Sequence, residues 1–487
     1  MKKYKIELTV FLCGAIGMML ELVAARVLSP YVGSSNLIWT TIIGVMLISM
    51  SIGYSIGGKI ADKKTDMNIL SFLILLGAFF TSLIPIFETA LVKTMSQASD
   101  NLVFIAIVTS ALIFGIPSFI VATVSPFAVK LRDSEKNHES VGKTSGRVSS
   151  LSTIGSIVGT FLAGFVLIPN LGVRTIILIT TIILFLLAFI IYDKKDVKYV
   201  CSMLVILLAL LGLNYYGKVL FEKSNPDIIE DVDSEYSRIW IKQIGNSEVS
   251  YKVMQVDTGT ESYINEETHE MGARYLYFYD LFDYYNKDAN STLMIGGAAY
   301  TYPTYYLNKY QDKTIDVSEI DDKMTELAVK DFGLDINNPR LTIYHQDGRS
   351  FLNYTKNKYD TILIDAFKGL NAPFELTTYE ALTNAKNALN DNGMVITNIL
   401  SSLEGEEEDF IKYEYATYKK VFDDVKLFKV TDAKAEERQN LILVGFKGDK
   451  NINEEKYDEY EDFLAREVTN FSSDREIVTD NYAPIGN

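Results

Sequence analysis

Cysteine and histidine are scarce in this chain of 487 residues, which has two cysteines, Cys13 and Cys201, and three histidines. Both cysteines lie in apolar runs, and the chain has no Cys-x-x-Cys pair. Zinc sites, haem sites and disulfide frameworks need more ligands or pairs than these residues supply. We therefore expect a protein that holds no metal.

Acidic residues are few in the first part of the chain, and basic residues are outnumbered in the rest. Residues 1–217 contain 17 Lys and Arg against 11 Asp and Glu, whereas residues 218–487 contain 29 against 51. This contrast excludes a purely soluble protein, a disordered chain and a collagen-like one. The acidic half also lacks the basic excess that phosphate backbones require, so we expect no nucleic-acid partner.

The apolar half contains seven hydrophobic segments, most of which approach the ~20 residues that a membrane-spanning helix needs. They predict a multispan α-helical membrane domain of about seven helices, with the lipid bilayer as its partner. The segments are 6–28, 38–58, 69–91, 102–124, 148–169, 174–192 and 198–216.

Basic residues gather at the N-terminus and in the loops that follow the second, fourth and sixth segments. These places hold 14 Lys and Arg, whereas the loops between the other segments hold only Lys93 and Arg174. Because cytoplasmic loops carry the basic excess, we expect a multi-pass protein of the cell membrane with a cytoplasmic N-terminus. Seven spans would place the acidic half outside the cell.

Strand and helix patterns alternate along the acidic half, which predicts a mostly parallel α/β sheet with helices on both faces. Short strands over residues 236–264 predict a small β-domain before it. We expect a bundle over 1–217, a polar linker and β-domain over 218–290, and an α/β domain over 291–487. The strands expected in the last domain are 292–295, 314–317, 341–344, 361–364, 394–398, 425–430 and 441–446.

Glycine or acidic residues follow the first four of these strands. They are Gly296 with Gly297, then Glu319, then Asp347 with Gly348, and then Asp365. In parallel sheets, ligands bind at the carboxyl ends of the strands, and an acid about 20 residues after a glycine turn can accept hydrogen bonds from ribose hydroxyls. We therefore expect a nucleoside-containing ligand. The acids would repel a pyrophosphate, and no GxxxxGK[ST] motif is present, so a cationic sulfonium nucleoside fits better.

Several motifs resemble the spermidine synthase (polyamine aminopropyltransferase) family, and particularly its membrane-fused members. The motifs are Leu293-Met-Ile-Gly-Gly-Ala-Ala-Tyr-Thr-Tyr-Pro303, Ile315-Asp-Val-Ser-Glu-Ile-Asp321, Gln346-Asp-Gly-Arg349, Tyr359-Asp-Thr-Ile-Leu-Ile-Asp365 and, in the first helix, Glu21-Leu-Val-Ala-Ala-Arg26. The resemblance implies a methyltransferase-like Rossmann fold behind a small β-domain, often as a homodimer. It also implies aminopropyl transfer from decarboxylated S-adenosylmethionine, or a related adenosyl donor such as S-adenosylmethionine, to a small amine, with release of methylthioadenosine.

The resemblance implies a role for each motif residue. Gly296 and Gly297 would border the nucleoside, Glu319 would bind the ribose, and Asp347, followed by Gly348, would bind the adenine amino group. Asp365 would be the base that deprotonates the attacking amine, because an ammonium group has no lone pair for the displacement.

The chain departs from the family pattern where the amine and the aminopropyl chain would bind. Ala299 and Lys368 stand where soluble members carry aspartates, and Glu261 stands in place of a glutamine. Glu261 would restore one carboxylate for a cation, and Tyr300 would contribute a ring face to the same site. Two alternatives stay open: an enzyme that uses the donor for other chemistry, and a transporter-like or sensory protein with a degenerate nucleoside- or polyamine-binding domain.

Overall fold

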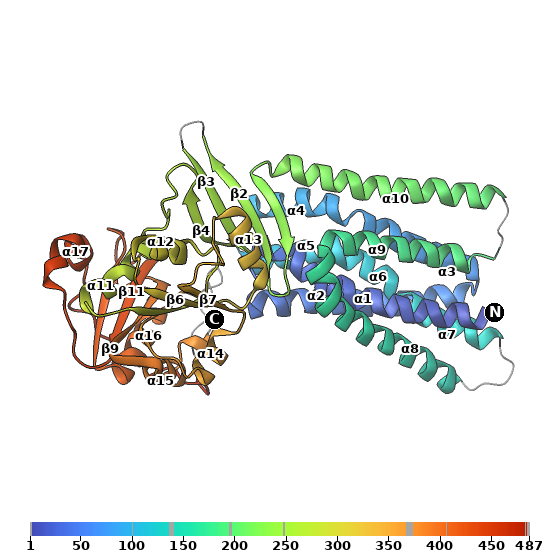
Figure 1. Ribbon diagram of the computed structural model, residues 1–487. Coiled ribbons are helices and arrows are strands. Elements are labelled where there is room, and N and C mark those ends of the chain that lie inside the picture. Colours follow the sequence, from blue (N-terminus) through green and yellow to red (C-terminus); the bar gives the residue numbers. More distant parts are fainter. Residues whose placement is uncertain are drawn as a thin grey trace. The chain divides into compact units, whose positions relative to one another are not determined.

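The computed structural model describes residues 2–99, 101–135, 141–193, 197–246, 249–366, 374–405, 407–482 and 484. These residues form two compact units, Met1–Trp240 and Ile241–Asn487 (Figure 1). Unit 1 is helical, and unit 2 combines strands and helices, as the change in sequence pattern predicts.

Unit 1 is built mainly from long apolar helices, which are labelled in Figure 1. They are α1 (Lys2–Val32), α2 (Asn36–Lys63), α3 (Met67–Ser82), α4 (Ile84–Ala98), α5 (Leu102–Ser110), η1 (Ala111–Gly115), α6 (Ile116–Ala122), α7 (Val124–Glu135), α8 (Val141–Leu162), η2 (Ala163–Leu167), α9 (Ile168–Ile191) and α10 (Val197–Ser224).

Five helical stretches in the described part of unit 1 are long and apolar enough to cross a membrane, or six if the bent pair α3 and α4 makes one span. The longest stretch, Val141–Ile191, contains both the fifth and the sixth expected segments. Gly172 separates them, because its φ of 72° and ψ of 159° are not helical. The number of spans therefore depends on how the bent pair and this interruption are counted.

Glycines let helices α1 and α8 approach each other closely. A Cβ added at Gly155 would lie 2.0 Å from the Phe11 carbonyl oxygen, and one at Gly159 would lie 2.4 Å from that of Ala15. No side chain fits at these distances, so the two backbones meet directly, as small residues permit in membrane helices. Gly155 and Gly159 thus form a packing surface of α8 against α1.

The strand β1 (Ile228–Asp233) belongs to unit 1, and the boundary between the units falls within β2 (Arg238–Gly245). The first part of the expected linker and β-domain, residues 218–235, holds the end of α10 and β1. In unit 2, β3 (Ser250–Val256) and β4 (Gly259–Asn265) form an antiparallel pair within the range expected for the small β-domain. Short helices follow at η3 (Arg274–Asp280) and α11 (Leu281–Tyr285).

The rest of unit 2 is organised around a seven-stranded sheet in the order β10-β11-β9-β8-β5-β6-β7. Its strands are β5 (Ser291–Ile295), β6 (Thr314–Ser318), β7 (Leu341–Tyr344), β8 (Tyr359–Ile364), β9 (Leu389–Ser401), β10 (Asp424–Lys429) and β11 (Gln439–Phe446). The five strands from β5 to β9 are parallel, and β10 and β11 are antiparallel additions at one edge. All seven strands expected from the sequence are present.

Helices cover both faces of this sheet (Figure 1). One face packs in a core with η3, α11 and α12, and the other packs in a core with α14, α15 and α16. The helices after β5 are α12 (Thr301–Lys309), α13 (Asp322–Asp331), α14 (Gly348–Tyr354), η4 (Phe374–Leu376), α15 (Tyr379–Ala388), α16 (Asp409–Val421), η5 (Glu454–Lys456) and α17 (Tyr457–Leu464). This is a doubly wound α/β arrangement, in which β5 and β8 lie on either side of the point where the strand order reverses.

Candidate active site

The candidate site begins at the glycine turn after β5, next to the end of β8. Gly296 has a φ of +90°, which glycine adopts without steric cost. A Cβ at this position would lie 2.2 Å from the carbonyl oxygen of Asp365. Glycine is therefore required on two grounds, and the turn brings the backbones that follow β5 and β8 into contact.

Glu319 follows β6 and holds the glycine turn from behind. Its Oε2 accepts the backbone N–H groups of Gly297 (2.8 Å) and Ala298 (3.1 Å), and its Oε1 accepts that of Asp321 (2.9 Å). Burial raises the pKa of this carboxyl, while the three N–H groups favour its charged form. The structure thus shows Glu319 organising the turn, and hydroxyl groups of a ligand would have to share its oxygens with these bonds.

Asp365 directly follows β8 at the reversal point. Its Oδ2 accepts the Tyr275 hydroxyl at 3.1 Å, and its Oδ1 lies 3.5 Å from the Asn398 amide nitrogen. Burial raises the pKa of Asp365 to about 6, against the opposing effect of these hydrogen-bond donors. A carboxylate with a pKa near neutrality is suited to accept and release a proton.

A cavity of about 290 Å³, open solvent included, lies beside these groups within unit 2. Its lining combines two carboxylates with aromatic rings, hydroxyls and the glycine turn. The described lining residues are Glu261, Ser262, Tyr275, Leu276, Met294, Gly296, Gly297, Ala298, Thr301, Tyr302 and Asp365. The described lining residues include the carboxylates of Glu261 and Asp365 and no Lys or Arg, which favours a cationic ligand.

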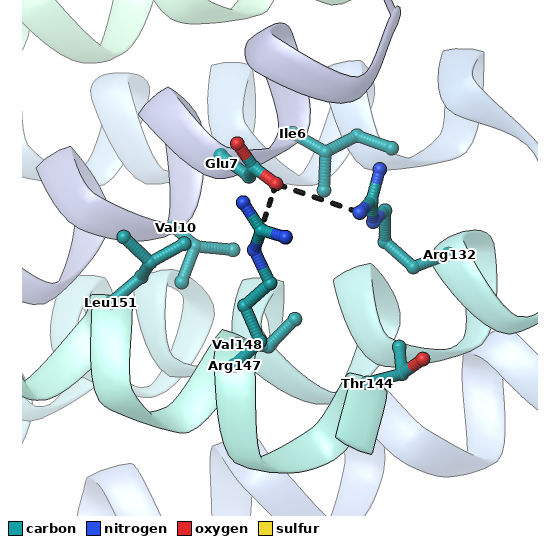
Figure 2. Close-up of a pocket in the computed structure, with 8 residues that line it drawn as sticks. All are labelled: Ile6, Glu7, Val10, Arg132, Thr144, Arg147, Val148 and Leu151. Carbon is teal, nitrogen blue, oxygen red and sulfur yellow. Dashed lines mark ion pairs between the residues drawn. The ribbon is translucent and has the colours of Figure 1, made fainter. Parts of the chain in front are cut away.

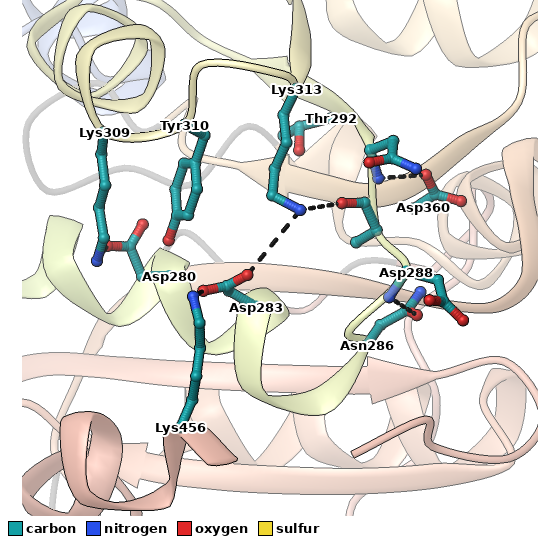
Figure 3. Close-up of polar contacts among 12 residues, drawn as sticks. Asp280, Asp283, Asn286, Asp288, Thr292, Lys309, Tyr310, Lys313, Asp360 and Lys456 are labelled. Carbon is teal, nitrogen blue, oxygen red and sulfur yellow. Dashed lines mark hydrogen bonds and ion pairs between the residues drawn. The ribbon is translucent and has the colours of Figure 1, made fainter. Parts of the chain in front are cut away.

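The aromatic wall of this cavity is anchored by a buried ionic cluster. The Tyr302 hydroxyl donates to Asp280 Oδ1 at 3.0 Å, and Lys309 Nζ lies 2.9 Å from Asp280 Oδ2. Figure 3 shows Asp280 beside Lys309, and the neighbouring Asp283 between Lys313 and Lys456. Lysines engage both acids, and Asp280 holds the Tyr302 ring in place through its hydroxyl.

The two residues expected at the end of β7 lie at the same edge of the sheet. The Asp347 side chain accepts the backbone N–H of Ser350 at 2.8 Å and caps α14, and it is exposed. A Cβ at Gly348 would lie 2.3 Å from the Ile295 side chain, so a glycine lets α14 pack closely on β5. The described residues that line the cavity include neither of them.

Tyr300 lies elsewhere than expected. It is fully buried, and its hydroxyl is 2.7 Å from that of Thr325. Its ring packs behind Gly297, because Tyr300 adopts a left-handed backbone conformation and begins α12. The cavity lining does not include Tyr300, so this burial gives no support to the expected ring face at the site.

Tyr275 and Asn398 contact Asp365 directly, although the sequence motifs mark neither of them as a site residue. Asn398 lies in β9, the parallel neighbour of β8, so its position in the sheet was a usable signal. Tyr275 precedes the sheet in sequence and was one of many tyrosines.

Glu261 lines the cavity as expected, Ala299 is buried, and Lys368 lies outside the described residues. Within the described ranges, no three His, Cys, Asp or Glu side chains are grouped to hold a metal ion.

The fold and the cavity together define a Rossmann-type α/β domain with an acidic site at the carboxyl ends of its strands. Residues 284–453 match the family described as the spermine/spermidine synthase domain. Residues 284–453 are therefore a spermidine synthase-like domain, as the motifs within them indicate.

Similar proteins carry related names. The chain is 25% identical over 409 residues to polyamine aminopropyltransferase 2 of Aquifex aeolicus, covering 80% of this chain and 78% of the relative. It is 34% identical over 112 residues to a probable polyamine aminopropyl transferase of Bifidobacterium longum, covering 23% of this chain and 24% of that one. A probable spermidine synthase from Corynebacterium glutamicum, of known structure, is 18% identical with a TM-score of 0.40, over 50% of this chain and 96% of that one.

The alignment with the Aquifex aeolicus relative extends beyond the α/β domain. Its 409 residues exceed the length of unit 2, so it includes part of the helical unit 1. The similarity therefore covers the combination of a helical unit with a spermidine synthase-like domain.

Proposed function

We propose that this protein is a membrane-anchored aminopropyltransferase. Its donor would be decarboxylated S-adenosylmethionine or a related adenosyl compound, and its acceptor a small amine. The observation that carries this proposal is the position of Asp365, a half-buried carboxylate with a raised pKa that lines the cavity beside the glycine turn. The two carboxylates of the described lining suit a donor with a sulfonium charge and an acceptor that arrives as an ammonium.

The reaction follows from these groups. The acceptor loses a proton to the Asp365 carboxylate, and its nitrogen lone pair then attacks the carbon next to the sulfonium. A carbon–nitrogen bond forms as the carbon–sulfur bond breaks, and the sulfur leaves as the neutral thioether methylthioadenosine. The Tyr275 hydroxyl holds the Asp365 carboxylate in position, and the aromatic wall excludes water from the reacting atoms.

Membrane anchoring is supported by the apolar helices of unit 1 and by the uneven distribution of loop charges. This pattern supports a multi-pass protein of the cell membrane with its N-terminus in the cytoplasm.

The proposal is tested by chromatography of a reaction with the full-length protein in detergent. Methylthioadenosine is expected to form only when both the decarboxylated donor and an amine are present, with propanediamine and monoamines compared as acceptors. The activity should sediment with membranes and be released by detergent but not by high salt. Binding of methylthioadenosine without turnover for any acceptor would contradict the enzyme and favour a degenerate binding module.

The rate of transfer is expected to depend on pH through Asp365. Because this carboxyl is neutral below its pKa of about 6, it accepts no proton there, and kcat/KM should rise about tenfold per pH unit up to that value. Above it the carboxylate is ionised and this dependence should level off. Rate measurements from pH 5 to 8 check this, with methylthioadenosine affinity as the control. An inflection that persists in Asp365→Asn would assign it to another group.

A further inference from the structure

A second polar pocket lies within the helical unit, far along the chain from the residues of the α/β domain. It is lined by residues of α1, α7 and α8, drawn in Figure 2: Ile6, Glu7, Val10, Arg132, Thr144, Arg147, Val148 and Leu151. Arg132 and Arg147 converge on Glu7 from α7 and α8, as the dashed lines show.

The charges in this pocket are unbalanced. Arg132 Nη2 lies 3.5 Å and Arg147 Nε 3.1 Å from the same oxygen, Glu7 Oε1, and that oxygen has no hydrogen bond among the described residues. One carboxylate therefore faces two guanidinium groups. Arg132 is only 4% exposed, so its charge is shielded from water. Among the described residues, Arg132 forms an ion pair with Glu7 at 3.5 Å, which is longer than a good hydrogen bond. A buried cation in this situation favours an additional anion.

Helix α8 continues from Arg147 as an exposed apolar stripe. Leu151 lies one turn after Arg147 on the same face, and Ile154, Val158 and Phe161 follow at helical spacing, exposed to 48%, 43% and 58%. With 1.5 Å of rise per residue, the stripe runs for about 20 Å, which exceeds the ~15 Å thickness of one hydrocarbon leaflet. A ligand that joins an anionic group to a long apolar chain matches both features.

We propose that this pocket binds the phosphate of an anionic phospholipid, with an acyl chain along the α8 stripe. The planar guanidinium groups match phosphate oxygens in two-pronged hydrogen bonding, and Thr144 adds a hydroxyl to the pocket lining. The expected position agrees with the basic loops of the chain, because anionic lipids attract basic residues at the cytoplasmic surface. The inference rests on the proposed membrane insertion of unit 1 and is independent of aminopropyl transfer.

Native mass spectrometry of the full-length protein in detergent tests this site with short-chain lipids. Dioctanoylphosphatidylglycerol is expected to bind at least tenfold more tightly than dioctanoylphosphatidylcholine, whose headgroup has no net charge. Arg147→Gln should weaken phosphatidylglycerol binding at least tenfold. Glu7→Gln should strengthen it severalfold, because it removes the carboxylate that competes for the guanidinium groups.

Lys59→Gln is the matched control, since it removes one exposed basic charge from α2 outside the pocket, and binding should stay within twofold. The Arg147 side chain is half-exposed, so its variant should keep the fold, which the thermal midpoint checks. Equal affinity for both lipids, unchanged binding by Arg147→Gln, or weaker binding by Glu7→Gln would overturn the proposal. Inorganic phosphate that competes at the same affinity as the lipid would show a phosphate site and overturn the lipid assignment. Sedimentation with membranes tests the anchoring separately.

Discussion

Asp365→Asn is expected to lower kcat for aminopropyl transfer by about a thousandfold while methylthioadenosine still binds, because general-base catalysis contributes about 10²–10⁴-fold. The amide keeps the size of the side chain and can still accept the Tyr275 hydroxyl through its carbonyl oxygen. It cannot take a proton from the acceptor. Methylthioadenosine release measures the rate, and calorimetry measures binding.

Asp316→Asn is the matched control for this variant. Asp316 also accepts a tyrosine hydroxyl, that of Tyr359 at 2.7 Å, but it lies within β6 and does not line the cavity. Its replacement should leave kcat within twofold. A rate for Asp365→Asn within tenfold of the native rate would show that another group is the base. Loss of methylthioadenosine binding would show that Asp365 maintains the site instead.

Glu319→Ala is expected to weaken methylthioadenosine binding by at least a hundredfold. The variant leaves the N–H groups of Gly297, Ala298 and Asp321 without their acceptor, and each buried unsatisfied group costs about 1–3 kcal/mol. The glycine turn would then lose the conformation that borders the cavity. Calorimetry with the full-length protein gives the change in affinity, and the thermal midpoint should fall as well.

Asp360→Ala separates loss of the site from loss of stability. Asp360 accepts the N–H groups of Asn290 (2.8 Å) and Ser291 (3.0 Å). These residues lie where β8 and β5 begin, whereas the site lies where these strands end. Asp360→Ala should lower the thermal midpoint as Glu319→Ala does. It should leave the affinity for methylthioadenosine within threefold of the native value. If both variants lose binding equally, Glu319 has no special role at the site. If Glu319→Ala binds normally, the turn does not border the nucleoside.

The elements of the α/β domain could be predicted because strands such as β5 and β8 are short, mostly buried apolar runs, and because the helices between the strands repeat apolar residues with the helical period. The candidate site residues after β5, β6 and β8 could be predicted once the strands were placed, because the carboxyl ends of parallel strands lie at one edge of the sheet. Tyr300 could not be placed, because its burial depends on the left-handed backbone that begins α12. The role of Glu319 in the glycine turn could not be predicted either, because the spacing of residues in the sequence does not show which way backbone N–H groups point.

The sequence by itself determined that an apolar helical part precedes an acidic α/β part with glycine and acidic residues at its strand ends, because hydrophobic period, charge balance and strand-end residues are local properties of the chain. Only the tertiary structure decided which groups meet. It placed Tyr275 and Asn398 on Asp365, and it brought Arg132 and Arg147 to Glu7. These contacts join segments far apart in the chain, and their distances are set by how helices and strands pack rather than by the order of residues.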